Sequence, residues 1–143
     1  MASSPSRDLD LILNLIEERS KPTRAQIGRF KVAVLSLIEP KLPSIGLECL
    51  TLGKHFAVGL DPEQPIREAL VRCWEYSDQR SPGGGLETSE ANAVRSVISL
   101  LHGLISDEED FVDSLSFFLT LVNNVEPHHS QQAELLNQHF GVG

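Results

Sequence analysis

Cysteine and aromatic residues are scarce in this sequence of 143 residues, which contains two cysteines, one tryptophan and one tyrosine. Cys49 and Cys73 lie in apolar stretches that are far apart along the chain. They form neither a disulfide framework nor a zinc-binding spacing. We therefore expect two buried free thiols in a reducing compartment.

Long apolar runs and a secretory leader are also missing. No apolar run approaches the roughly 18 residues of a membrane span. The first ten residues, MASSPSRDLD, lack the basic segment and apolar core of a signal peptide. These absences predict a cytoplasmic protein that does not enter a membrane.

Basic residues nearly disappear from the second half of the chain. The sequence holds 12 Lys and Arg against 20 Asp and Glu, a net charge of −8. Residues 1–71 are balanced, with 9 of each sign, whereas residues 72–143 hold 3 basic and 11 acidic side chains. Such a surface repels phosphate backbones, so we predict no binding to nucleic acid. It attracts a basic protein surface instead.

Apolar spacing predicts an all-α protein with one compact domain over 1–143. About 41% of the residues are apolar, enough for a core without metal or disulfide. Helix start and stop signals, with apolar residues at i, i+3, i+4 and i+7, predict seven helices. The expected ranges are 7–19, 23–39, 44–58, 62–78, 89–102, 106–124 and 128–140. We expect frayed residues at 1–5, a flexible glycine-rich loop at 80–88 and a tail at 141–143.

The range 106–124 is expected to be the central helix. Ser106 and Glu109 have capping-box spacing, so the helix should start there. Its body is apolar apart from a narrow polar stripe, which means that other helices must cover most of it. The stripe is formed by Asp113, Ser116, Thr120 and Asn123.

Other local patterns leave alternatives open. Glycines weaken the helix at 44–58, and its alternation over 45–52 is also compatible with a strand. Ser6, Thr23 and Thr88 are candidate N-caps, and Gly103 is a candidate helix end. Successive helical pairs could stack as in an α-solenoid.

The acidic cluster at the start of 106–124 is the main candidate site. It comprises Asp107, Glu108, Glu109, Asp110 and Asp113. Acidic residues in a first helical turn complement the helix dipole without any further role. The cluster could also dock a basic partner, or bind Mg²⁺ if a second carboxylate pair such as Glu17 and Glu18 faced it.

Other motifs indicate little chemistry. His128 and His129 are adjacent and lack metal-ligand spacing, and Gly83–Gly85 lacks the Lys-Ser/Thr of a phosphate loop. Trp74 is expected in the core, whereas Tyr76 and Asp78 are secondary contact candidates on the same helix. No nucleophile motif is found, so we predict no catalytic residues and no cofactor.

The whole chain resembles the small acidic all-α immunity proteins that bacteria carry beside toxins. The likeness lies in size, charge, helical content and the segment REALVRCWEYSDQR, Arg67–Arg80, followed by ANAVRSVISLLHG. It implies a stoichiometric complex that blocks a basic toxin. The acidic cluster, Tyr76 and Asp78 are the contacts we predict from the residues themselves.

Two other function classes are also compatible with the sequence. One is a helical scaffold that dimerises through an apolar face of the last helix, which carries Leu135. The other is a Mg²⁺-dependent helical hydrolase that acts on a nucleotide or phosphate ester through the carboxylates at 108–113. The sequence leaves the choice between monomer and homodimer open.

Overall fold

The computed structural model describes residues 5–19, 22–60, 63–80, 85, 88–106 and 111–141. Within these ranges the chain forms seven α-helices and one 3₁₀ turn, and no strand. The helices are α1 Pro5–Arg19, α2 Arg24–Leu37, α3 Ser44–Ala57, α4 Glu63–Arg80, α5 Ser89–Ile105, α6 Phe111–Val125 and α7 His129–Phe140, and the 3₁₀ turn is Glu39–Lys41. The predicted all-α fold is confirmed, and the alternative strand at 45–52 is wrong because this range belongs to α3.

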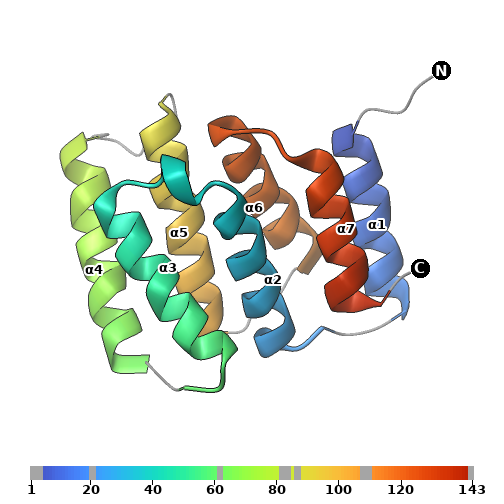
Figure 1. The fold of residues 1–143 in the computed structure, drawn as a ribbon, viewed down its shortest axis with the longest axis horizontal. Helices are drawn as coiled ribbons and strands as arrows, with labels where there is room; N and C mark the ends of the chain where they lie inside the picture. The colour runs from blue at the N-terminus through green and yellow to red at the C-terminus, as the bar shows by residue number, and fades with distance from the viewer. Residues whose placement is uncertain are drawn as a thin grey trace.

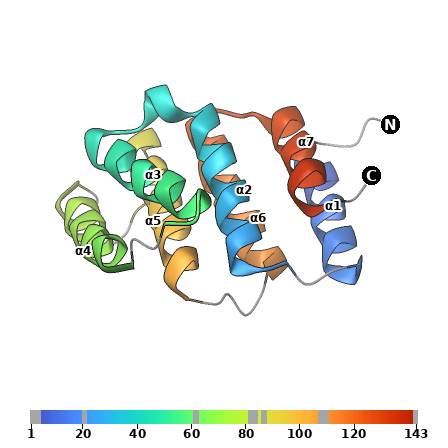
Figure 2. The same ribbon diagram turned by 60° about the horizontal axis from the view of Figure 1, so that its bottom comes forward.

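The helices pack in two layers (Figures 1 and 2). One layer contains α3, α2 and α7, and the other contains α4, α5, α6 and α1 in that order. The first and last helices pack together, and α1 also packs against α6. Contacts of the first helix with the last two suit a closed bundle better than an α-solenoid, in which each unit contacts only its sequence neighbours.

The most enclosed helix is α5 rather than α6. It packs against α2, α3, α4 and α6, whereas the principal contacts of α6 are with α5 and α1. The buried side chains of α5, such as Leu100 and Leu101, are fully covered. The central position expected for 106–124 is therefore taken by α5, because that helix lies between neighbours in its own layer and beneath the other layer.

Caps explain several helix boundaries. The Thr23 hydroxyl accepts a hydrogen bond from the Gln26 backbone N–H at 3.1 Å, and the Gln26 side chain accepts one from the Thr23 N–H at 2.8 Å. The Thr88 hydroxyl similarly accepts from the Ala91 N–H at 3.0 Å. These two predicted N-caps are confirmed.

Two other predicted boundaries, the N-cap at Ser6 and the helix end at Gly103, are wrong. Ser6 lies inside α1, and Gly103 is buried inside α5 instead of ending it. Ser106 follows α5 as its C-cap, where its N–H donates to the His102 carbonyl at 3.1 Å. The proposed partner of Ser106 in a capping box, Glu109, lies outside the described residues.

Candidate protein-binding site

An open groove crosses the outer face of α5 between α4 and α6. Its volume is about 350 Å³. Four residues at helical spacing on α5 form its floor, and residues of α4 and α6 form its walls. The lining residues are Trp74, Arg95, Ile98, Ser99, His102, Ser114 and Phe117.

Two large aromatic side chains stand on opposite sides of this groove, which we call the aromatic groove. Trp74 on α4 is 43% exposed, and Phe117 on α6 is 49% exposed. The Arg95 guanidinium lies over the Trp74 ring, 5.0 Å from its centre. Half-exposed aromatic rings with an adjacent arginine are typical of the residues that dominate protein–protein binding.

The exposure of Trp74 contradicts the expectation that it lies in the core. The buried stripe of α4 is formed by Ile66, Ala69, Cys73 and Ser77. Trp74 follows Cys73 in the sequence, so its side chain points about 100° further around the helix axis. Its indole therefore lies at the edge of the contact between α4 and α5.

The exposed stripe of α6 differs from the predicted polar stripe, because it includes Phe117. Asp113, Phe117, Thr120 and Asn124 are exposed, at spacings of three or four residues. Ser116 and Asn123 of the predicted polar stripe are half-buried instead. The Asn123 side chain bonds to Gln132 at the join between α6 and α7, which explains why that amide faces inward.

Two predicted carboxylates flank the aromatic groove. Asp78 lies one helical turn after Trp74, and Asp113 lies one turn before Phe117. Both side chains are exposed. The other predicted acidic contacts, Asp107, Glu108, Glu109 and Asp110, lie outside the described residues. A carboxylate therefore lies one helical turn from each of the two aromatic residues of the groove.

Tyr76 has an intramolecular role at the join between α4 and α5. Its hydroxyl donates to Glu90 at 2.9 Å, and the Arg80 guanidinium lies 4.0 Å from its ring centre. Arg80 also pairs with Glu90 at 2.8 Å. Burial and the bond to Glu90 raise the pKa of Tyr76, so the phenol stays protonated at neutral pH. A binding role for Tyr76 stays a prediction.

A buried lysine supports the floor of the groove. Lys31 of α2 donates from Nζ to the Ser99 carbonyl and to the Ser99 hydroxyl, both at 3.2 Å. The same Nζ lies 5.4 Å from the Phe118 ring centre. The apolar spacing of the sequence does not single out this residue, although a lone lysine between Phe30 and Val32 on the buried side of a helix was an available signal.

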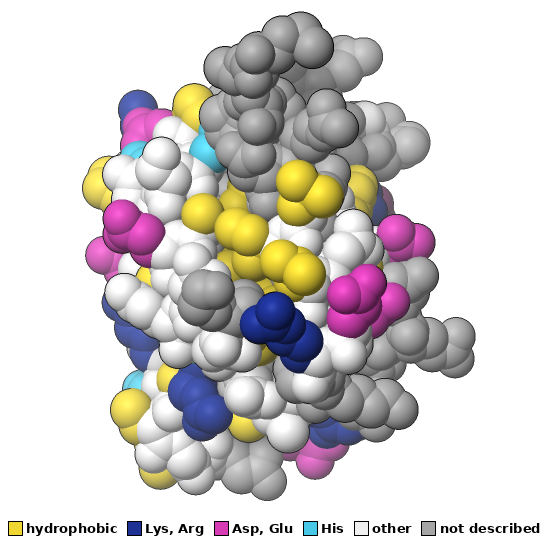
Figure 3. Space-filling view, turned by 90° about the vertical axis from the view of Figure 1, so that its right-hand side faces the viewer, with side chains coloured by type: hydrophobic (Ala, Val, Ile, Leu, Met, Phe, Trp, Pro, Cys, Tyr) yellow, Lys and Arg dark blue, Asp and Glu magenta, His cyan; other side chains and the backbone are white. Residues whose placement is uncertain are grey.

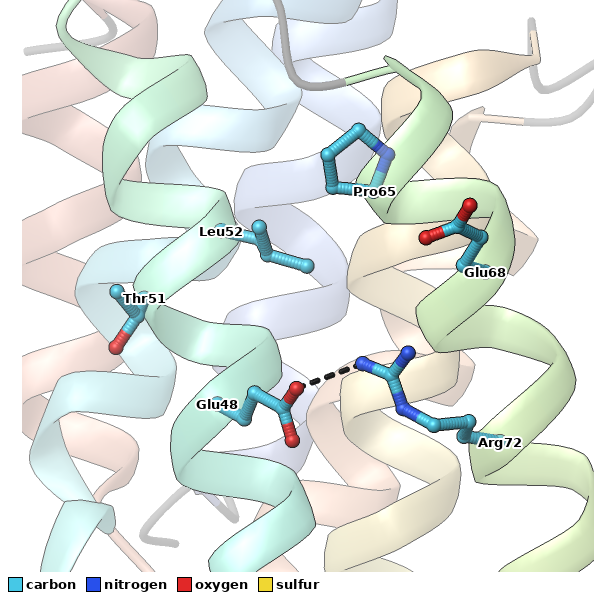
Figure 4. A pocket seen from close by; sticks show the side chains of 6 residues that line it. All are labelled: Glu48, Thr51, Leu52, Pro65, Glu68 and Arg72. Carbon is cyan, nitrogen blue, oxygen red and sulfur yellow. Dashed lines mark hydrogen bonds and ion pairs between the residues drawn. The ribbon is translucent and has the colours of Figure 1, made fainter.

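A second hollow of about 400 Å³ lies between α3 and α4 (Figure 4). Glu48 and Arg72 point toward each other across it and form an ion pair of 2.7 Å. Its remaining lining residues are Thr51, Leu52, Pro65 and Glu68. The principal opposite charges of this hollow therefore already pair with each other.

The structure supports the expectation of free, buried cysteines but brings them together. The Sγ atoms of Cys49 on α3 and Cys73 on α4 are 3.3 Å apart. Sequence separation gave no sign of this contact, because it depends on how α3 and α4 pack.

Within the described ranges, no cluster of side chains supports metal binding. No three His, Cys, Asp or Glu side chains there are grouped so that they could hold an ion. Glu17 and Glu18 are exposed on α1, and His128 is paired with Glu126 at 2.7 Å.

No helix in the described part of the chain is long and apolar enough to cross a bilayer.

Comparison with known proteins identifies no relative: no protein-family model, curated protein or solved structure matches the chain.

Proposed function

We propose that this protein is a non-catalytic binding module of the immunity or inhibitor type, which neutralises a basic protein partner such as a bacterial toxin. The observation that carries the proposal is the aromatic groove, where Trp74 and Phe117 present half-exposed rings on two helices. Burying such rings against a partner removes apolar surface from water and supplies most of the binding energy in many interfaces.

The charge of the chain supports a basic partner. The net charge is −8, and no Lys or Arg follows Arg95. Asp78 and Asp113 place carboxylates beside the aromatic rings, and the sequence adds four more at 107–110. In this arrangement the rings supply affinity, whereas the carboxylates speed association and select a basic surface.

The test starts with capture of partners from the host lysate by tagged protein, with washes at about 0.05 M and about 0.5 M salt. The captured protein is then purified, and its Kd is measured for wild type, Trp74→Ala and Phe117→Ala. We expect a basic partner, equal stoichiometry and at least a ten-fold loss of affinity in each variant. Leu47→Ala, which removes an exposed leucine of α3, is the matched control.

Charge is tested separately with a variant in which residues 107–110 and Asp113 all become amides. We expect slower association and a weaker dependence of Kd on salt. An acidic partner, or unchanged affinity in both aromatic variants, would refute the proposal.

A second candidate, self-association, is supported by the outer face of α1. Hydrophobic side chains gather in the middle of the side on which α1 and α7 lie (Figure 3). Leu11 and Leu15, one turn apart on α1, are 55% and 43% exposed. The sequence predicted a dimerisation surface on the last helix, but Leu135 of α7 is partly buried against the core. We therefore propose α1 in place of α7 as the helix that would carry this surface.

Light scattering over a range of concentrations tests this second candidate. A dimer that becomes a monomer in Leu11→Ser/Leu15→Ser would support it. A monomer at the highest concentration would exclude it and leave the groove as the interaction surface.

A further inference from the structure

The side chains of Cys49 and Cys73 occupy the interior of the contact between α3 and α4. Both are fully buried, and their Sγ atoms are 3.3 Å apart in a sulfur–sulfur hydrogen bond. A disulfide bond is about 2.05 Å long, so small side-chain rotations and a small approach of the helices would be needed to form it. The two positions are 24 residues apart. The fold therefore holds together two thiols that an unfolded chain would bring into contact only rarely.

A charged residue with an exposed side chain precedes each cysteine in the sequence. Glu48 precedes Cys49 and Arg72 precedes Cys73, and these two side chains form the ion pair that crosses the hollow between α3 and α4 (Figure 4). The hollow lies between the same two helices, α3 and α4, whose contact holds the thiols. A brief separation of the exposed ion pair would open a path toward the sulfur atoms.

The surroundings make the two thiols unequal. The hydrogen bond with Cys49 and the nearby Arg72 guanidinium lower the pKa of Cys73, against the opposing effect of burial. The same hydrogen bond and burial raise the pKa of Cys49. These opposite shifts favour Cys73 as the attacking thiol in the step proposed below, because the thiolate is the reactive form.

We propose that Cys49 and Cys73 are a thiol oxidation site that forms a reversible disulfide between α3 and α4. The oxidant is a small disulfide. The Cys73 thiolate attacks one sulfur atom of the oxidant, a mixed disulfide forms, and the first small thiolate leaves. Cys49 then attacks Cys73 Sγ, the protein disulfide forms, and the second small thiolate leaves. The protein loses two electrons, and its two thiol protons end on the two small thiols released.

The proposal is independent of the proposed binding function, because neither cysteine lines the aromatic groove. The disulfide would close a loop that contains the connection between α3 and α4. Such a crosslink lowers the conformational entropy of the unfolded chain. It therefore stabilises the folded protein, provided that the native geometry fits the bond without strain.

The test is an equilibrium with reduced and oxidised glutathione, carried out once with folded protein and once in urea. Free thiols are trapped by alkylation, and intact mass separates the dithiol, mixed-disulfide and disulfide forms. We expect the disulfide to form within single chains, with an equilibrium constant at least about ten-fold larger in the folded protein than in urea. An equal or smaller constant in the folded protein would overturn the proposal and leave the thiols as packing groups.

Single variants and unfolding provide the second measurement. Cys49→Ala and Cys73→Ala should form mixed disulfides or remain reduced, and neither should form the internal bond. Oxidised wild type should unfold at a higher urea concentration than reduced wild type, and dithiothreitol should reverse the difference. Disulfides found only between chains, or a lower unfolding midpoint after oxidation, would also contradict the proposal.

Discussion

Gly53 of α3 faces Leu100 of α5 so closely that a Cβ atom at Gly53 would lie 2.9 Å from Leu100 Cδ2. The same atom would lie 2.9 Å from Val32 Cγ2 on α2. Both neighbours are buried, Leu100 completely. The missing side chain thus lets α3 approach α2 and α5 together, which holds the two layers of the bundle close at this point.

The first prediction concerns Gly53→Ala. Alanine favours a helix over glycine by about 1 kcal/mol, but overpacking of a core costs about 1–3 kcal/mol. Because side chains from two helices confine the site, we expect the free energy of unfolding to fall by about 1 kcal/mol net. Urea denaturation measures the change, and Thr51→Ala on the exposed side of α3 is the control. Equal or greater stability of Gly53→Ala would show that the helices can move apart at little cost.

The glycines show which parts of the fold a sequence can reveal. Apolar spacing and the caps at Thr23 and Thr88 depend on neighbours within four residues, so they correctly predicted the seven helices found in the described residues. Gly53 was interpreted only as a weak point in a helix, because its neighbours Val32 and Leu100 lie far away in the sequence. Its role in helix packing becomes visible only when α2, α3 and α5 are placed in space.

The second prediction concerns Trp74, the only tryptophan in the chain. Because Trp74 is 43% exposed, acrylamide should quench its fluorescence strongly in the folded protein. Trp74→Ala should lower the free energy of unfolding by only about 1 kcal/mol, whereas Leu100→Ala should lower it by about 2–5 kcal/mol. A blue-shifted emission that acrylamide does not quench would instead place the indole in the core.

The candidate site could also be predicted only in part, because it depends on how helices that are distant in the sequence pack together. Asp78 and Asp113 were identified as charged surface residues, and the structure leaves both exposed. The expectation for Trp74 was wrong because a helix such as α4 carries more apolar residues than one buried stripe can hold. Only the packing of α4 on α5 decides that Cys73 is covered and Trp74 is left at the edge.

The third prediction concerns the N-cap of α2. Thr23→Ala removes the hydroxyl that accepts the Gln26 N–H at 3.1 Å, and we expect a loss of about 1 kcal/mol in the free energy of unfolding. Thr23→Ser retains the acceptor and should restore most of that loss. Thr120→Ala, which changes an exposed threonine within α6, is the control. Equal stability of the alanine and serine variants would show that the cap contributes little.

The fourth prediction concerns pH and His139 on α7. Its ring packs edge-on against Phe30, with 6.0 Å between ring centres. Burial, and to a smaller extent the Arg29 guanidinium, lower the pKa of His139 below its ordinary value of about 6.5. The folded protein therefore binds this proton less readily than the unfolded chain does.

The sign of the effect follows from that difference. The stability that depends on neutral His139 is fully present above the unfolded pKa of about 6.5 and is lost as the pH falls below it. We expect a decrease in the free energy of unfolding between about pH 7.5 and pH 5.5, and a smaller decrease in His139→Gln. Urea titrations across this range measure both, and NMR of the His139 ring protons reports the pKa directly. An undiminished decrease in His139→Gln would assign the acid sensitivity to other groups, because glutamine cannot take up the proton.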